Sequence, residues 1–120
     1  MEALSVVLYQ NDPRSAQTLA ADLSQHFDCV YVALSYQEVS AAVARQHADA
    51  LVLDLEASGA SEIERLHHEF PGLCIVGTHR LADTELWAEA LKYGAADICE
   101  PRHHEVVRSV LHHLVRHAAA

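Results

Sequence analysis

The chain has 120 residues, of which 51% are hydrophobic and 21% are charged. This length and composition are typical of one folded domain and exclude a disordered segment, so we expect a single domain over residues 1–120. The formal net charge is −9, from 8 basic and 17 acidic residues. Such a charge repels nucleic-acid phosphates and anionic membranes, and it argues against direct binding to either.

The sequence also predicts where the chain resides. No apolar run approaches the roughly 20 residues that span a bilayer, and no signal-peptide pattern precedes the first apolar run. The cysteines Cys29, Cys74 and Cys99 each lie in an apolar run, so we expect three reduced, buried thiols. These features predict a cytoplasmic protein.

Short apolar runs alternate with amphipathic segments in the first half of the chain. The runs that predict buried strands lie at residues 5–9, 29–33 and 50–53. Asp12 before Pro13 is a helix-start pattern. The apolar face of that helix is marked by Leu19, Leu23 and Phe27. Ser35 with Glu38 forms a capping-box pattern that predicts the start of a second helix.

The second half repeats the alternation. Ser61 and Glu64 form another capping-box pattern, and Asp83 and Gly94 are typical of the start and end of a further helix. The remaining predicted elements are strands at residues 73–77 and 96–99 and a helix at 103–117. Five strand–helix units in succession predict a parallel α/β sheet with right-handed crossovers.

Polar residues follow the predicted strands at the edge where such sheets carry their functional sites. These residues are Gln10, Asn11, Asp12, Asp54 and Thr78. A carboxylate such as Asp54 can be a phosphoryl nucleophile, a metal ligand or a helix cap. The hydroxyl of Thr78 can bind a phosphoryl oxygen or belong to an ordinary turn, and the residues alone leave these alternatives open.

Four segments resemble bacterial two-component response-regulator receiver domains. They are Val7–Pro13, Asp54-Leu55 with Gly59, Thr78, and Ala90–Asp97. The similarity covers nearly the whole chain in the same order and spacing. It implies a flavodoxin-like (βα)5 three-layer sandwich with a five-stranded parallel sheet of order 2-1-3-4-5. It also implies a signalling domain and not an enzyme.

The resemblance implies roles for several residues. Asp54 is the phosphoacceptor, supplied by a histidine kinase or a phosphotransfer protein, and Thr78 senses the phosphoryl group. In the family, Mg²⁺ is held by an acidic pair, by the acceptor aspartate and by a backbone carbonyl two residues later, here that of Glu56.

This sequence departs from the family pattern at the metal site. Gln10 and Asn11 stand at the two acidic positions, and Asp12 comes one residue later. The implied metal ligands are therefore Asn11, Asp12, Asp54 and the Glu56 carbonyl. Mg²⁺ prefers carboxylate oxygens, so we expect its binding here to be weak or absent.

A second departure concerns charge. Glu100 replaces the family's lysine ahead of Pro101, and Arg102 lies beyond that proline. At ~4 Å and a surface-like dielectric, a pair of unit charges is worth about 4 kcal/mol, so reversing the sign of one partner is a large change. The segment 94–101 is also one residue shorter than in the family, and Ile98 replaces an aromatic residue.

Two versions of the function follow. In the first, Asp54 accepts a phosphoryl group weakly or atypically, and the domain signals through protein contacts. In the second, the domain is a phosphorylation-independent pseudo-receiver used for dimerisation or partner binding. The implied partners are an output domain, another protein or a second copy bound through residues 83–117, where Trp87 is either a contact residue or part of the core.

A third reading belongs to a different class, a small flavodoxin-like enzyme or cofactor carrier. The segment 10–14 lacks the Ser, Thr and Gly of a phosphate-binding loop, and neither a nucleophile elbow nor a P-loop pattern is present. These absences count against it. His113 and His117 have a spacing that suits a metal pair, but a solvated helix face is the favoured explanation for them.

Overall fold

The chain folds into a central parallel sheet covered by helices on both faces. The computed structural model describes the backbone of residues 4–119 and the side chains of residues 4–114 except that of His103. The strands are β1 (Ser5–Tyr9), β2 (Cys29–Val32), β3 (Ala50–Asp54), β4 (Cys74–Thr78) and β5 (Asp97–Cys99). They pair in parallel in the order β2-β1-β3-β4-β5, which confirms the predicted architecture and strand order.

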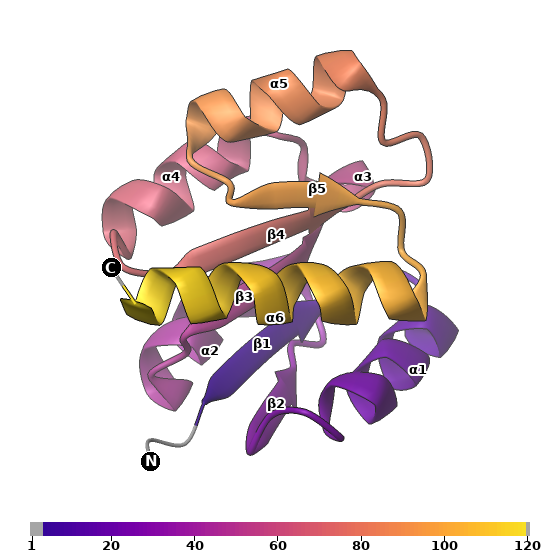
Figure 1. The fold of residues 1–120 in the computed structure, drawn as a ribbon, viewed down its shortest axis with the longest axis vertical. Helices are drawn as coiled ribbons and strands as arrows, with labels where there is room; N and C mark the ends of the chain where they lie inside the picture. The colour runs from indigo at the N-terminus through magenta and orange to yellow at the C-terminus, as the bar shows by residue number, and fades with distance from the viewer. Residues whose placement is uncertain (1–3, 120) are drawn as a thin grey trace.

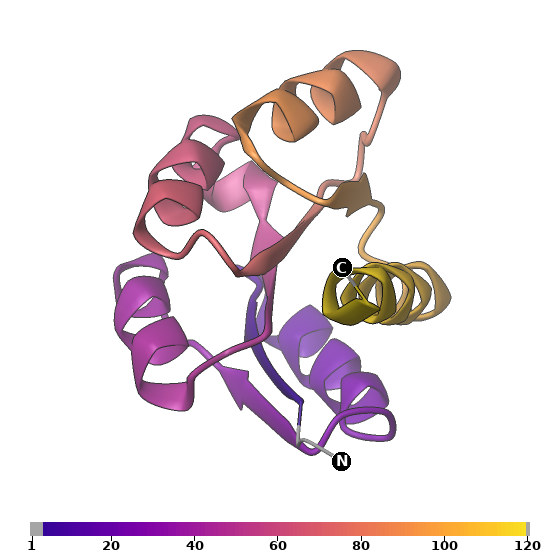
Figure 2. The same ribbon diagram turned by 60° about the vertical axis from the view of Figure 1, so that its left-hand side comes forward.

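The helices form the two outer layers. They are α1 (Pro13–Leu23), the 3₁₀ helix η1 (Tyr36–Glu38), α2 (Val39–Gln46), α3 (Leu55–Ser58), α4 (Ser61–Glu69), α5 (Thr84–Tyr93) and α6 (His103–Ala119). Figures 1 and 2 show α1 and α6 on one face of the sheet and α2, α4 and α5 on the other. No helix in the described part of the chain has the length and apolarity needed to cross a bilayer.

Strand alternation divides the core in two. Val7 and Leu51 belong to the cluster under α2, α4 and α5, whereas Val6 and Val52 belong to the cluster under α1 and α6. Every residue of β1, β3 and β4 is buried. Continuous apolar runs are what central parallel strands require, because helices cover both of their faces.

Three of the predicted helix boundaries are confirmed. The Asp12 carboxylate accepts the Arg14 N–H (3.3 Å) at the start of α1. The Asp83 carboxylate accepts the Leu86 N–H (2.9 Å) at the start of α5. Gly94 ends α5 with φ of +114°, a left-handed conformation that glycine adopts without steric cost.

Neither predicted capping box forms its hydrogen bonds, although a helix begins at both places. Ser35 precedes η1, as predicted, but makes no side-chain cap, and the Glu38 carboxylate accepts from the Leu34 N–H (3.1 Å) and the Tyr31 hydroxyl. At α4 the residue that precedes the helix is Ala60, which makes no side-chain cap. The cause is α3, a short helix absent from the prediction, which carries the chain directly into α4.

Two predictions of burial also need correction. Phe27 is buried, but α1 ends at Leu23, so Phe27 packs from the loop that follows. Cys74 is buried and Cys99 is half-buried, whereas Cys29 is exposed. Cys29 begins β2, which is an edge strand and has no neighbouring strand on its outer side.

Candidate functional site

The carboxyl ends of β1, β3 and β4 meet at one edge of the sheet. Asp54 ends β3 directly beside Thr78, which ends β4. A cleft of about 470 Å³ opens there, and its lining includes Gln10, Asn11, Asp12, Asp54, Glu56 and Arg80. The predicted polar residues are therefore brought together, although Thr78 itself does not line this cleft.

Asp54 is held by the backbone on both sides of its carboxylate. One oxygen, Oδ2, accepts the N–H of Asn11 (2.9 Å), and the other, Oδ1, accepts the N–H of Glu56 (3.0 Å). The side chain caps α3, and the residue is only 7% exposed. The carboxylate thus ties the end of β1 to the start of α3.

Thr78 is closed off from solvent by Gln10. The Nε2 amide of Gln10 donates to the Thr78 hydroxyl oxygen at 2.8 Å, and Thr78 is 1% exposed. This hydrogen bond joins the ends of β1 and β4 across β3. Sequence analysis placed Gln10 at a metal-binding position, and the structure makes it the partner of the predicted sensing residue.

The cation beside the cleft is one that sequence analysis missed. The Arg80 guanidinium pairs with Glu56 at 2.8 Å, and the Arg80 backbone N–H also donates to that carboxylate (3.2 Å). The Arg80 hydrogen bonds hold the pKa of the Glu56 carboxyl below its ordinary value, although partial burial opposes this. Arg80 is largely exposed, so the pair contributes little to stability.

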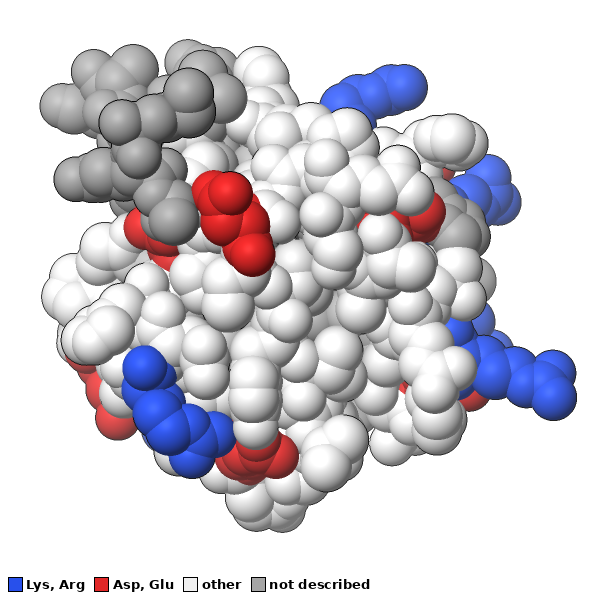
Figure 3. All heavy atoms as spheres, turned by 90° about the horizontal axis from the view of Figure 1, so that it is seen from below, with Lys and Arg blue, Asp and Glu red and all other residues white. Residues whose placement is uncertain are grey.

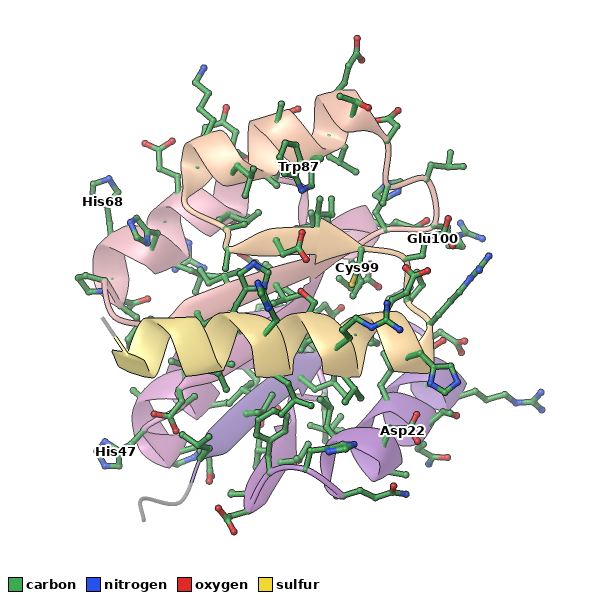
Figure 4. The ribbon with its side chains drawn as sticks, viewed as in Figure 1. Asp22, His47, His68, Trp87, Cys99 and Glu100 are labelled. Carbon is green, nitrogen blue, oxygen red and sulfur yellow. The ribbon has the colours of Figure 1, made fainter. Side chains whose placement is uncertain are left out.

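Glu100 does not point a charge into the cleft. Its carboxylate pairs with the Arg102 guanidinium at 2.9 Å on the surface, as its position in Figure 4 shows. Only Pro101 of this segment lines the cleft. Arg102 therefore neutralises Glu100 and does not replace the missing lysine. His79 is not among the residues that line the cleft, and its Nδ1 accepts the Leu81 N–H (2.9 Å).

The carboxylates at the cleft already have partners within the protein. Asp12 accepts from the Arg14 N–H and the Ser15 hydroxyl, Asp54 is capped by two N–H groups, and Glu56 is paired with a guanidinium. Among the described residues, no group of three His, Cys, Asp or Glu side chains is placed to hold a metal ion. Asn11, Asp12, Asp54 and the Glu56 carbonyl remain a predicted ligand set only.

A second polar cluster joins α5, β5 and α6. Asp97 accepts from the Trp87 indole N–H (3.3 Å) and from the Ser109 hydroxyl (2.7 Å). Trp87 is 46% exposed, so it is not a core residue. Figure 4 shows Trp87 directed from α5 toward β5.

The predicted histidine pair is tested only in part. His113 lies near the Asp97 cluster, and its Nδ1 is 2.8 Å from the Ser109 carbonyl oxygen. The side chain of His117 lies outside the described residues. The metal-pair reading therefore stays a prediction.

Leu55, the residue after Asp54, packs closely against the backbone of Gly77. A Cβ at Gly77 would lie 2.6 Å from the Leu55 Cδ1. Leu55 is buried, so Gly77→Ala is expected to lower the free energy of unfolding by about 1–2 kcal/mol through overpacking. Urea unfolding measures this loss. Gly72→Ala, where an added Cβ meets no atom within 4 Å, is the matched control, and equal effects of both changes would contradict the contact.

Comparison with known proteins was made on both sequence and structure. No family model and no curated protein matches the sequence. Solved structures do match. A CheY-like response regulator receiver domain protein from Methanospirillum hungatei JF-1 superposes with a TM-score of 0.85 at 15% identity, covering 98% of each chain. The Francisella response regulator 1452 receiver domain gives a TM-score of 0.82 at 21% identity, covering 94% of this chain and 98% of that one.

A third match is a domain within a longer protein. NtrX from Brucella abortus, solved in complex with ADP, gives a TM-score of 0.80 at 17% identity, covering 96% of this chain but 26% of that one. All three likenesses extend over nearly the whole of the present chain. The chain has the fold of response-regulator receiver domains.

Proposed function

We propose that this chain is a cytoplasmic signalling domain that acts through protein contacts without phosphorylation of Asp54, that is, a pseudo-receiver. The observation that carries the proposal is the buried hydrogen bond from the Gln10 amide to the Thr78 hydroxyl. The Thr78 hydroxyl oxygen accepts the amide hydrogen bond and is covered by Gln10, so a phosphoryl group on Asp54 reaches this hydroxyl only if Gln10 moves. Thr78, which the resemblance to receiver domains makes the sensor of the phosphoryl group, is here a buried residue held by Gln10.

The charges of the cleft support the same proposal. Phosphoryl transfer is promoted by cations that neutralise the transferring oxygens. The cleft carries the carboxylates of Asp12, Asp54 and Glu56, and its lining includes one guanidinium, that of Arg80, which is already paired. Glu100 replaces the expected lysine and is paired with Arg102. The cleft therefore offers an incoming phosphate little stabilisation.

Partner binding is proposed for the face formed by α5, β5 and α6, within residues 83–117. Trp87 is half-exposed there and is fixed by Asp97, which also binds α6 through Ser109. Partly buried aromatic residues often dominate interfaces. The occupant is an output domain, a partner protein or a second copy. The place of a like fold within the longer NtrX chain supports an output domain.

A second candidate function is weak phosphoryl uptake on Asp54 from a histidine kinase or phosphotransfer protein. Arg80 favours it, because its guanidinium lies at the cleft and contributes a charge interaction with Asp54. In that case the Arg80 guanidinium would neutralise part of the phosphoryl charge, as the missing lysine does in the family. For this, Arg80 must first leave its ion pair with Glu56.

Beryllofluoride, a phosphoryl mimic, separates the two. Backbone amide NMR shifts are recorded with and without the mimic and Mg²⁺, in the natural chain and in Asp54→Ala. The pseudo-receiver proposal predicts no shift at Asp54, Thr78 or β5. Shifts at these positions that are lost in Asp54→Ala and weakened in Arg80→Ala would establish the second candidate and overturn the first.

A further inference from the structure

The outer edge of β2 carries backbone groups that no neighbouring strand binds. β2 is the outermost strand and pairs with β1 alone. The N–H groups of Cys29 and Ala33 donate to carbonyls of the β1 segment at 3.3 and 2.9 Å. Because hydrogen-bonding groups alternate sides along a strand, those of Val30 and Val32 point outward.

This edge lacks the charged residues and prolines that often protect an edge strand. The segment 29–34 contains no charged residue, proline or glycine, and all but its cysteine and alanine are strand-forming or large apolar residues. Leu34, at its end, is 86% exposed. Figure 3, which looks at the β2 side of Figure 1, shows that side chains other than Lys, Arg, Asp and Glu make up most of this face.

We propose that two copies of this chain associate by antiparallel pairing of their β2 edges, which makes one continuous sheet across both copies. The register follows from the outward groups. When Val30 of one copy lies opposite Val32 of the other, all the outward groups of both valines are paired, and Tyr31 lies at the twofold axis. Two Tyr31 rings then form a cross-strand aromatic pair, which is a favourable contact.

The neighbouring registers are worse for local reasons. A shift of two residues one way places Val30 opposite Leu34, whose N–H is already bound by its own Glu38 (3.1 Å). A shift the other way places Val32 opposite Asp28, an exposed acidic residue whose carboxylate binds the Leu4 N–H. The proposed register pairs both valines of each strand without using Leu34 or Asp28 as their partner.

Charge does not oppose a second copy at this edge. The net charge of −9 makes copies repel wherever acidic surfaces face each other. In the proposed register Asp28 lies opposite Leu34 of the other copy, so the two Asp28 residues are separated by about 20 Å along the strand. That distance exceeds the Debye length of about 8 Å at physiological ionic strength, so their repulsion is screened. The association is independent of the proposed function and leaves the α5–β5–α6 face free.

Sedimentation analysis over a wide range of protein concentrations tests the proposal. The natural chain is expected to form a dimer. Val32→Pro removes one outward N–H from each strand, which an edge strand tolerates, and is expected to weaken association by about 30-fold. Circular dichroism checks that the variant is folded. A natural chain that stays monomeric at every concentration overturns the proposal.

Charge variants at Leu34 test the register without altering the backbone. Leu34→Glu places a like charge opposite Asp28 and is expected to weaken the dimer several-fold, whereas Leu34→Lys is expected to strengthen it. Leu81→Glu, at another exposed leucine, is the matched control and leaves the dimer unchanged. A dimer that is lost in Trp87→Ala and retained in the β2-edge variants overturns the proposal in favour of the opposite edge.

Thiol cross-linking gives a direct readout. Cys29 is exposed, whereas burial raises the pKa of Cys74 to about 11 and that of Cys99 to about 12, which suppresses their reactivity. In the proposed register the two Cys29 residues are offset by about 13 Å, a span suited to a bismaleimide. A covalent dimer is expected that is absent in Cys29→Ser and reduced in Val32→Pro. A cross-link unaffected by Val32→Pro and both Leu34 changes overturns the register.

Discussion

The combined variant Gln10→Asp, Asn11→Asp and Glu100→Lys is expected to accept a phosphoryl group on Asp54 only with Mg²⁺, at a rate at least on the order of 100-fold above the detection limit, below which the natural chain stays. The first change removes the amide that donates to Thr78 and frees its hydroxyl. Together with the second, it supplies the carboxylates that the metal prefers. The third removes an anion that Arg102 now neutralises and supplies a cation in its place.

Phosphoryl uptake from acetyl phosphate, followed by intact mass, measures this gain. The same three changes with Asp54→Ala are the control and are expected to abolish it. Glu100→Lys alone keeps the hydrogen bond of Gln10 and is expected to give little activity. A folded combined variant that remains inert with Mg²⁺ would contradict the claim that these three positions disable the site.

The variant Asp54→Ala is expected to lower the free energy of unfolding by about 3 kcal/mol. The carboxylate accepts two backbone N–H groups, and each hydrogen bond to a charged partner is worth about 1.5–3 kcal/mol. Alanine leaves the N–H groups of Asn11 and Glu56 without this acceptor and removes the cap of α3. Urea unfolding, monitored by circular dichroism, measures the change.

Asp54→Asn provides the graded comparison. Its amide oxygen accepts one N–H group while its NH₂ group cannot accept the other, so an intermediate loss is expected. If Asp54 is a structural link, the natural chain is the most stable, Asp54→Asn is intermediate and Asp54→Ala is the least stable. Asp54→Ala that is as stable as the natural chain, or more stable, would show that the carboxylate is held under electrostatic strain and does not serve as a structural link.

Much of the fold was predictable because its signals are local. A fully apolar run such as residues 50–53 is stable in the centre of a parallel sheet, where helices cover both of its faces. Asp12, Asp83 and Gly94 act within one helical turn, so their patterns identify helix ends directly. The capping boxes failed because their pattern requires only two residues, and a four-residue helix such as α3 has no periodicity to reveal it.

The candidate site was predictable only at the level of strands. Parallel topology brings Asp54 and Thr78 to one edge, and their neighbouring positions follow from that. The hydrogen bond of Gln10 spans 68 residues, and the contact of Arg80 with Glu56 spans 24. Neither follows from sequence spacing, because each depends on side-chain directions at the ends of different strands.

The most direct test of the central claim is phosphoryl uptake by the natural chain. Purified protein is incubated with excess acetyl phosphate, with and without Mg²⁺, beside Asp54→Ala, and intact mass is followed over time. The account predicts no added phosphoryl mass in any sample. A Mg²⁺-dependent mass increase that disappears in Asp54→Ala would contradict it and establish a working phosphoacceptor.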